Sequence, residues 1–405
     1  MLKRAVSIML LILMISACSP SPGPDVVTEA PATATITPAP TTAVPPTETT
    51  APPTPTTAPT ATVTPQAYGP DNFPENVNPL TGLAVSDPTI LDRRPVAVKV
   101  QMFPRGQRPP YGVSLADIVF DFYQNLGATR LTAIFYGQDA ERVSPIRSAR
   151  LFDIEIVSMF DATFAFGSAD HRILNRIVNQ GFGDRLIIES QTECPPNPMC
   201  RVEPNGPNYL ITDTALLTEW AAEHGVPKER PDLSGMSFDP EVPEGGQPAD
   251  TAIVRYNFSN YNRWEYDEAT GRYLRFQENA DAQDVAAESF APLMDGLTGE
   301  QVAADNVVVL FATHSYAFQT RPGPNEIVEI DLTGTGRAFA FRDGQVYELT
   351  WNRTQNDAPL YLTFEDGARY PYKPGNTWYN VIGSSSGVEP LTGEDNGYRF
   401  IFAIP

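Results

Sequence analysis

The chain has 405 residues, and its 49 Asp and Glu outnumber its 28 Lys and Arg, so its net charge is −21. This acidity excludes nucleic acid as a general partner, because proteins that bind phosphate backbones present basic surfaces. It is typical of an exposed surface that repels copies of itself.

Residues 1–17 have the pattern of a lipoprotein signal peptide. Lys3 and Arg4 precede a short apolar run over residues 5–15, and Ser16 and Ala17 then lead to Cys18. A basic start, an apolar core and small residues at the end are typical of a secretory signal. We therefore predict cleavage before Cys18 and its acylation by a lipid such as palmitate. The alternative is an ordinary signal peptide that happens to contain a cysteine.

Residues 18–73 are predicted to be a lipid-anchored tether. Residues 19–66 include 13 Pro and 15 Thr and contain no Lys, Arg or aromatic residue. Such a segment cannot bury a core and is typical of extended polyproline II, which reaches up to ~150 Å at ~3.1 Å per residue. Together with Cys18, this predicts an extracytoplasmic protein held at the outer face of the cytoplasmic membrane by its lipid.

The remaining cysteines, Cys194 and Cys200, lie close together in a proline-rich loop. Two neighbouring cysteines in an exported protein indicate a disulfide. A metal site would need further ligands, and no histidine lies nearby in the sequence, so the sequence predicts neither a metal site nor a cofactor.

The folded part is predicted to contain two domains. Residues 74–230 are expected to form an α/β or α+β domain, with a mixed sheet flanked by helices, because apolar strand patterns alternate with helical ones. The expected strands cover 95–101, 117–123, 130–136 and 162–167, and the expected helices cover 148–160, 169–178 and 212–224.

Residues 231–250 are rich in Pro, Gly and Asp and are predicted to be a linker. Residues 251–405 are expected to be mostly β. Asp343-Gly344 separates two strand patterns and predicts a tight hairpin, and the apolar run 306–312 predicts a strand that is buried on both faces.

Several motifs occur in an order that resembles a known family. They include Asn78-Pro79-Leu80-Thr81-Gly82, Pro145-Ile146-Arg147-Ser148-Ala149-Arg150 and Pro374-Gly375-Asn376-Thr377-Trp378. The series resembles the YerB-like lipoprotein family, whose two halves are domains of unknown function. The resemblance implies a lipoprotein with a two-domain plan and brings no established reaction. Its members tend to have Pro-His-Asn near the end of the first domain, whereas this chain has Pro207-Asn208 without the histidine.

The segment around Arg147 and Arg150 is the strongest candidate for a ligand site. It follows a predicted strand and is expected to enter a helix, capped by Ser144 or Ser148. Guanidinium groups beside the N–H groups of a helix start would bind phosphate or carboxylate. The alternative is that these arginines form structural salt bridges with Asp117, Asp121, Asp153 or Glu155.

The candidate anion-binding set is completed by residues from the neighbouring predicted elements, and it consists of Asp117, Arg130, Arg147, Ser148, Arg150 and Asn208. The order of an acidic residue and then arginines resembles that in LytR-CpsA-Psr phosphotransferases, which act on lipid-linked glycans. The sequence therefore favours an envelope protein that binds a cell-wall glycan or another envelope protein. A phosphotransferase-like enzyme that uses Asp117, Arg147 and Arg150 is the alternative, so enzymatic activity stays open.

Overall fold

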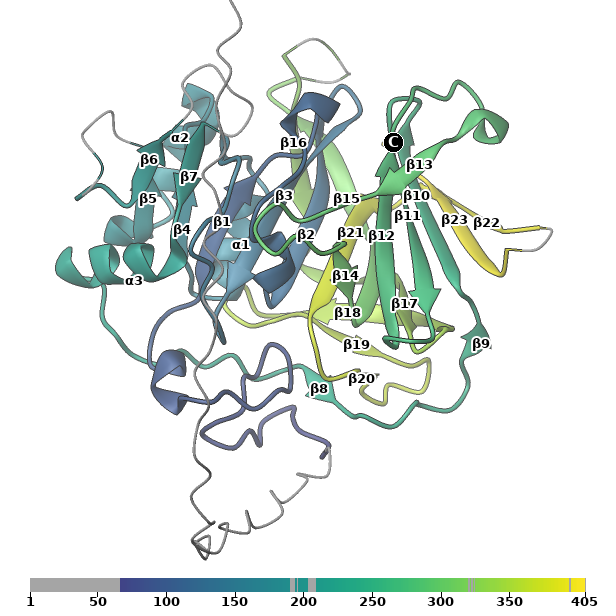
Figure 1. Ribbon diagram of the computed structural model, residues 1–405, viewed down its shortest axis with the longest axis horizontal. Helices are drawn as coiled ribbons and strands as arrows, with labels where there is room; N and C mark the ends of the chain where they lie inside the picture. The colour runs from purple at the N-terminus through teal and green to yellow at the C-terminus, as the bar shows by residue number, and fades with distance from the viewer. Residues whose placement is uncertain are drawn as a thin grey trace, which may run out of the picture. The chain divides into compact units, whose positions relative to one another are not determined.

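A long mixed β-sheet runs through the fold and takes strands from both halves of the chain (Figure 1). The structure is a computed structural model, which describes residues 66–189, 194, 196–202, 209–319, 321, 323, 325–392 and 395–404. Across this sheet the strands are β19 (Tyr361–Thr363), β18 (Gln345–Arg353), β17 (Gly334–Arg342), β15 (Asn306–Ala317), β21 (Thr377–Gly383), β2 (Ile118–Asn125), β3 (Ala128–Phe135), β1 (Val96–Val100), β4 (Thr163–Phe166) and β5 (Leu186–Ile188). At its margins, β16 (Ile327–Asp331) pairs with β15, and β9 (Gln247–Pro248) pairs with β18.

The central strands are long apolar runs, and they are buried along nearly their whole length. Every residue of β1 and β3 is buried, as expected for strands that are covered on both faces. A tight turn at Leu126-Gly127, where both residues have positive φ, joins β2 to β3 in an antiparallel hairpin. The same backbone conformation at Asp343-Gly344 joins β17 to β18, which confirms the hairpin predicted there.

The two halves of the chain meet inside this sheet. Strand β21, from the second half, lies between β2 and β15 and runs parallel to both. The segment 231–250, predicted to be a linker, also contributes paired strands. They are β9 and β8 (Ser237–Phe238), and β8 pairs with β20 (Pro371–Tyr372). The described residues accordingly belong to one compact unit.

A second sheet packs against the first and encloses much of the core. Its strands are β13 (Phe290–Pro292), β12 (Arg272–Glu278), β11 (Asn260–Asp267), β10 (Thr251–Asn257), β23 (Gly397–Ile401) and β22 (Gly387–Pro390), and β14 (Ala303–Ala304) pairs with β12. The rings of Trp264 in β11 and Trp378 in β21 lie 5.3 Å apart, edge to face, and both are buried. The large aromatic area that this contact removes from water holds the two sheets together.

The helices are short, and the fold as a whole is mostly β, with all three described α-helices in the first half of the chain. They are α1 (Asp153–Met159), α2 (His171–Val178) and α3 (Thr214–Glu223). Asp170 caps α2 and Asp213 caps α3 by accepting hydrogen bonds from backbone N–H groups of the first turn. Figure 1 shows α2 and α3 beside β4 and β5, together with the short pair β6 (Met199–Arg201) and β7 (Leu210–Thr212). Single 3₁₀ turns occur at Pro88–Leu91, Arg105–Gln107, Val113–Leu115, Gly183–Arg185 and Val285–Ala287.

The most important difference from the sequence prediction concerns the helix expected at 148–160. Helix α1 begins only at Asp153, and Ser144 and Ile146 instead form β-bridges with Tyr111 and Val100. These contacts between distant residues hold the arginine segment in an extended conformation. The arginines are therefore outside the first turn of a helix, and the predicted helix-terminus contribution to an anion site is wrong.

Candidate functional site

Three arginines lie close together beside the start of β3, and we call Arg130, Arg147 and Arg150 the arginine cluster. Arg130 and Arg150 both donate to the carbonyl oxygen of Ser148, with N···O distances of 2.5 and 3.3 Å. Arg150 also donates to the side-chain oxygen of Gln124, at 2.6 Å. Arg147 stacks over the ring of Tyr209, 4.9 Å from its centroid. The extended 145–150 segment and the edge of the hairpin thus bring three of the predicted residues together with Ser148.

The carboxylates that were expected to neutralise these arginines are engaged elsewhere. Asp121 pairs with Arg275 across the two sheets, at 2.7 Å, and Glu155 pairs with Arg353, at 2.5 Å. Asp153 pairs with the buried Lys99, at 3.0 Å. The alternative of structural salt bridges therefore fails for Arg130 and Arg150, because neither forms an ion pair with a carboxylate in the described part of the chain.

Asp153 is the carboxylate nearest to the cluster, and its oxygens are already used. One oxygen accepts from Lys99 Nζ and Thr132 Oγ1, at 3.0 and 2.6 Å, and the other accepts from the backbone N–H of Arg150, at 2.6 Å. The two further acids that act on the cluster electrostatically also have partners. Asp170 binds Arg172, at 3.0 Å, and Glu189 pairs with Arg201. Among the described residues, Arg130 and Arg150 therefore keep an excess of positive charge inside an acidic protein.

Burial makes this excess of positive charge unfavourable, and the pKa values of the basic groups show the effect. Burial, followed by repulsion from Arg150, lowers the pKa of Arg130 well below its ordinary value. Burial also lowers the pKa of Arg150 to about 10 and that of Lys99 to about 7. The Nε–H of Arg130 is buried and finds no hydrogen-bond partner among the described residues. A buried charge without a counter-ion is unfavourable, and an anion bound at Arg150 would offset the charge.

A pocket of about 220 Å³ opens beside the cluster. Arg150 and Ser148 line it from one side, the start of α2 lines it from another, and Asn125 and Glu326 complete it. The Ser148 hydroxyl also lies 2.9 Å from that of Ser168, so two hydroxyl groups stand near the guanidinium of Arg150. The lining therefore contains two guanidinium groups, Arg150 and Arg172, two carboxylates, Asp170 and Glu326, and hydroxyl and amide groups that could hydrogen-bond an oxyanion.

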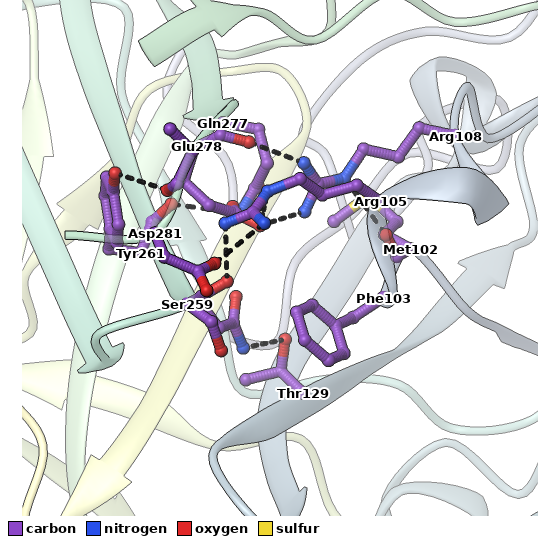
Figure 2. Close-up of polar contacts among 12 residues, drawn as sticks. Met102, Phe103, Arg105, Arg108, Thr129, Ser259, Tyr261, Gln277, Glu278 and Asp281 are labelled. Atoms are coloured by element: carbon purple, nitrogen blue, oxygen red, sulfur yellow. Dashed lines mark hydrogen bonds and ion pairs between the residues drawn. The ribbon is translucent and has the colours of Figure 1, made fainter. Parts of the chain in front are cut away.

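The arginines on the neighbouring segment 102–108 provide a contrast. Figure 2 shows Arg105 and Arg108 pointing toward Glu278 at the end of β12. Arg108 lies 2.5 Å from Glu278, and Arg105 lies 2.8 Å from Asp281. These two arginines are neutralised and connect the two halves of the chain, whereas Arg130 and Arg150 have no carboxylate partner among the described residues.

Asp117 lies far from the arginine cluster. Strands β2 and β3 run antiparallel, and the Asp117 carboxylate accepts from the backbone N–H groups of Tyr136 and Gly137, at 2.5 and 3.1 Å. The chain after β3 then turns back along the sheet, so Arg150 contacts Gln124 at the other end of β2. Seven strand residues at ~3.3 Å each separate these ends by ~23 Å. The expectation that Asp117 lies within reach of Arg147 or Arg150 is therefore wrong.

Two of the remaining predicted residues, Asn208 and Cys18, lie outside the described residues. Cys194 and Cys200 are joined by a disulfide, with their Cα atoms 5.4 Å apart. No group of three or more His, Cys, Asp or Glu gathers at a possible metal site in the ranges that the structure describes. Within the same ranges, none of the helices is long and apolar enough to cross a membrane.

Sequence reasoning missed Lys99, Gln124 and Asp153 as parts of this site. Lys99 is a charged residue inside the otherwise apolar run of β1, and such a break in the pattern indicates a buried ion pair. Gln124 gives no comparable signal, because polar residues are common at strand ends. Asp153 was considered only as a partner of the arginines, and its pairing with Lys99 depends on contacts that the sequence does not reveal.

Comparisons with known proteins agree with the resemblance found in the sequence. Residues 80–225 match the model of the "Protein of unknown function (DUF3048) N-terminal domain", and residues 252–379 match that of the corresponding C-terminal domain. YerB of Bacillus subtilis (strain 168), a protein described as a lipoprotein, is 27% identical over 329 residues, which are 77% of this chain and 88% of YerB. The crystal structure of B. subtilis YerB superposes with a TM-score of 0.61 at 25% identity and covers 76% of this chain and 96% of that one. The chain therefore belongs to the YerB-like family, which is built from the N- and C-terminal DUF3048 domains.

Proposed function

We propose that this protein is a lipid-anchored, extracytoplasmic binding protein that holds an anionic group of a cell-wall component at the arginine cluster. The lipobox-like residues before Cys18 and the similarity to a lipoprotein support the location. The ligand group is an oxyanion, phosphate or carboxylate, because a guanidinium fork matches the geometry of both.

The lack of a carboxylate partner among the described residues at Arg130 and at the pocket-lining Arg150 is the observation that carries this proposal. An acidic chain has ample carboxylates to neutralise a buried arginine, and it does so for Arg275, Arg353 and Arg108. Arg130 and Arg150 are exceptions, because they have no carboxylate partner among the described residues. Burial makes such an unpaired charge unfavourable. An unpaired, poorly solvated charge beside a polar pocket is typical of a binding site rather than of a structural ion pair.

The phosphotransferase alternative loses its geometric basis, because it requires Asp117 beside Arg147 and Arg150. The described carboxylates near Arg150 are already engaged. Asp153 accepts from Lys99, Thr132 and the backbone of Arg150. The pocket-lining Asp170 pairs with Arg172, and Glu326 accepts from Tyr123 and the backbone of Leu126. We therefore propose binding without a chemical step.

Thermal unfolding of the detergent-solubilised full-length protein in inorganic phosphate tests the proposal. Phosphate should raise the Tm above that in sodium chloride of equal ionic strength, because a ligand that binds only the folded state stabilises it. Acetate in a second series would separate carboxylate from phosphate preference. Arg150→Ala should abolish the rise, whereas Arg337→Ala, which removes an exposed arginine paired with Glu348, should retain it. An equal rise in wild type and Arg150→Ala, or no rise in either anion, would contradict the proposal.

A further inference from the structure

A second, larger pocket of about 570 Å³ lies where the two halves of the chain meet, and we call it the junction pocket. The first half contributes Asn78, Ser114 and Asp117, and the second half contributes Arg272, Asp305 and Asn376. Its volume falls within the ~300–1,000 Å³ of small-molecule sites. It lies at the Asp117 end of β2, ~23 Å from the arginine cluster, and no role has been given to it above.

Hydrogen bonds between distant segments hold the first-half wall of this pocket in place. Asn78 donates to Asp117, at 2.8 Å, and the backbone N–H of Thr377 donates to the Asp117 carbonyl, at 3.0 Å. Gly137 packs so closely on Asn78 that an added Cβ would lie 2.5 Å from its amide nitrogen. The wall therefore has little freedom to collapse into the cavity.

The second-half wall is fixed in a similar way. Asp305 and Asn376 exchange two hydrogen bonds, at 3.0 and 3.1 Å, and Arg272 donates to the Asn376 side chain, at 3.0 Å. The backbone N–H of Gly375 donates to the carbonyl of Thr81, at 2.8 Å, which ties this wall to the first half. Because the polar side chains of the walls are fixed before binding, little conformational entropy is lost when a ligand binds.

The chemistry of the lining excludes several ligand classes. The carboxylates of Asp117 and Asp305 outnumber the guanidinium of Arg272, so an anion would be repelled. The described lining contains too few His, Cys, Asp and Glu side chains to hold a metal ion. A wholly apolar ligand would strip water from these polar groups and leave them without partners.

The lining does offer both donors and acceptors. The hydroxyl of Ser114 and the Nε–H of Arg272 are buried and have no hydrogen-bond partner among the described residues, although Arg272 Nε lies 3.4 Å from Asp305. The Asp117 carboxylate can accept one further hydrogen bond, because Oδ2 accepts two and Oδ1 accepts only the one from Asn78. A hydroxyl group donates and accepts at once, so a ring that carries several hydroxyls satisfies both kinds of group.

We propose that the junction pocket binds a neutral saccharide ring. The proposal does not rest on the function of the arginine cluster, because the two sites share no residue. Planar carboxylate, amide and guanidinium side chains from Asp117, Asn376 and Arg272 would hydrogen-bond the ring hydroxyls, and the Ser114 hydroxyl would add one more bond.

Calorimetric titration of the detergent-solubilised full-length protein with the methyl glycosides of glucose and N-acetylglucosamine tests this proposal. Wild type should bind at least one glycoside saturably, with a Kd on the order of 1 mM. Ser114→Ala removes an unpartnered hydroxyl, so the protein should fold normally and bind roughly threefold to tenfold more weakly. Ala84→Phe, at another residue that lines the cavity, should fill it and abolish binding, whereas Ala269→Phe in an exposed turn should not.

Arg150→Ala should bind the glycoside as wild type does, so failure of one site can be told from failure of the other. The proposal is overturned if neither glycoside binds saturably to wild type. It is also overturned if Ser114→Ala and Ala84→Phe, both shown to be folded by circular dichroism, bind as tightly as wild type.

Discussion

Arg130 and Arg150 converge on one acceptor, the carbonyl oxygen of Ser148, and neither forms an ion pair within the described ranges. A buried guanidinium group, Arg130, and a half-buried one, Arg150, share one neutral acceptor and repel each other. The repulsion persists because both sit on strongly hydrogen-bonded segments, β3 and the extended 145–150 stretch. This relationship is the basis of the proposed anion site, and it leads to measurable consequences.

The first prediction concerns the stability cost of the unpaired charge. Arg130→Met removes a buried charge and keeps an apolar side chain of similar length, so in chloride buffer the free energy of unfolding should rise by about 1 kcal/mol or stay unchanged. Urea unfolding measures this. Arg275→Met is the matched control, because it breaks the buried pair with Asp121 and should cost about 3–5 kcal/mol. Similar losses in both variants would mean that Arg130 has an ordinary structural role.

The second prediction concerns the carboxylate nearest to the cluster. Asp153→Asn removes the negative charge that faces Lys99, Arg130 and Arg150, and should lower the free energy of unfolding by about 3–5 kcal/mol. Lys99→Met should lower the free energy of unfolding much less, because it removes one positive charge from a region with an excess of positive charge. Equal costs for the two variants in urea unfolding would show that the pair acts alone and that the arginines do not contribute to the local potential.

The third prediction is a pH dependence from Asp117. Burial, opposed by hydrogen bonds from Gly137, Tyr136 and Asn78, raises its pKa from 3.8 to about 6. Between these values the folded state binds a proton that the unfolded state has lost. The contribution of Asp117 to stability is therefore fully present below pH 4 and is lost as the pH rises through 6. Relative to Asp117→Asn, wild type should lose about 3 kcal/mol between pH 4 and pH 7.

This comparison uses urea unfolding of both proteins at matched pH values. The variant is itself destabilised, because the amide presents a donor to Asn78 or to a backbone N–H, but that loss does not depend on pH. The pKa of Asp117 is not raised if the two proteins have parallel stability profiles, or if wild type gains stability relative to the variant as the pH rises.

The fourth prediction concerns the anchor. Cys18→Ala removes the proposed acylation site, so the protein should appear in the medium or remain at its precursor size. Fractionation and immunoblotting measure this. A Cys18→Ala protein of mature size that still sediments with membranes would contradict the lipid anchor. Stable attachment requires more than one acyl chain, since a single chain binds membranes only reversibly.

Much of the β structure could be predicted because its signals are local. The predicted bounds of β1 and β2 lie within two residues of the observed ones, and the turn at Asp343-Gly344 is confirmed. Strand β15 begins at Asn306 as predicted but continues to Ala317, five residues beyond the predicted end. The periodicity of residues 148–160 also predicted a helix that exists in its second half, as α1.

The site could not be predicted because it depends on non-local contacts. Residues 148–152 have helical spacing but stay outside α1, and bridges from Ser144 to Tyr111 and from Ile146 to Val100 keep the preceding chain extended. The same bridges carry Arg147 to the far end of β2 from Asp117. The predicted candidate set grouped Asp117 with these arginines, because sequence order does not reveal the path of the chain after β3.

The most direct test of the anion site is an NMR titration of the detergent-solubilised full-length protein, labelled with ¹⁵N-arginine, with inorganic phosphate. The account predicts that the Nε–H resonances of Arg130 and Arg150 shift together and saturate with one Kd, and that Arg150→Ala abolishes the shift of Arg130. Shifts confined to exposed arginines such as Arg337, rising linearly with phosphate, would contradict it.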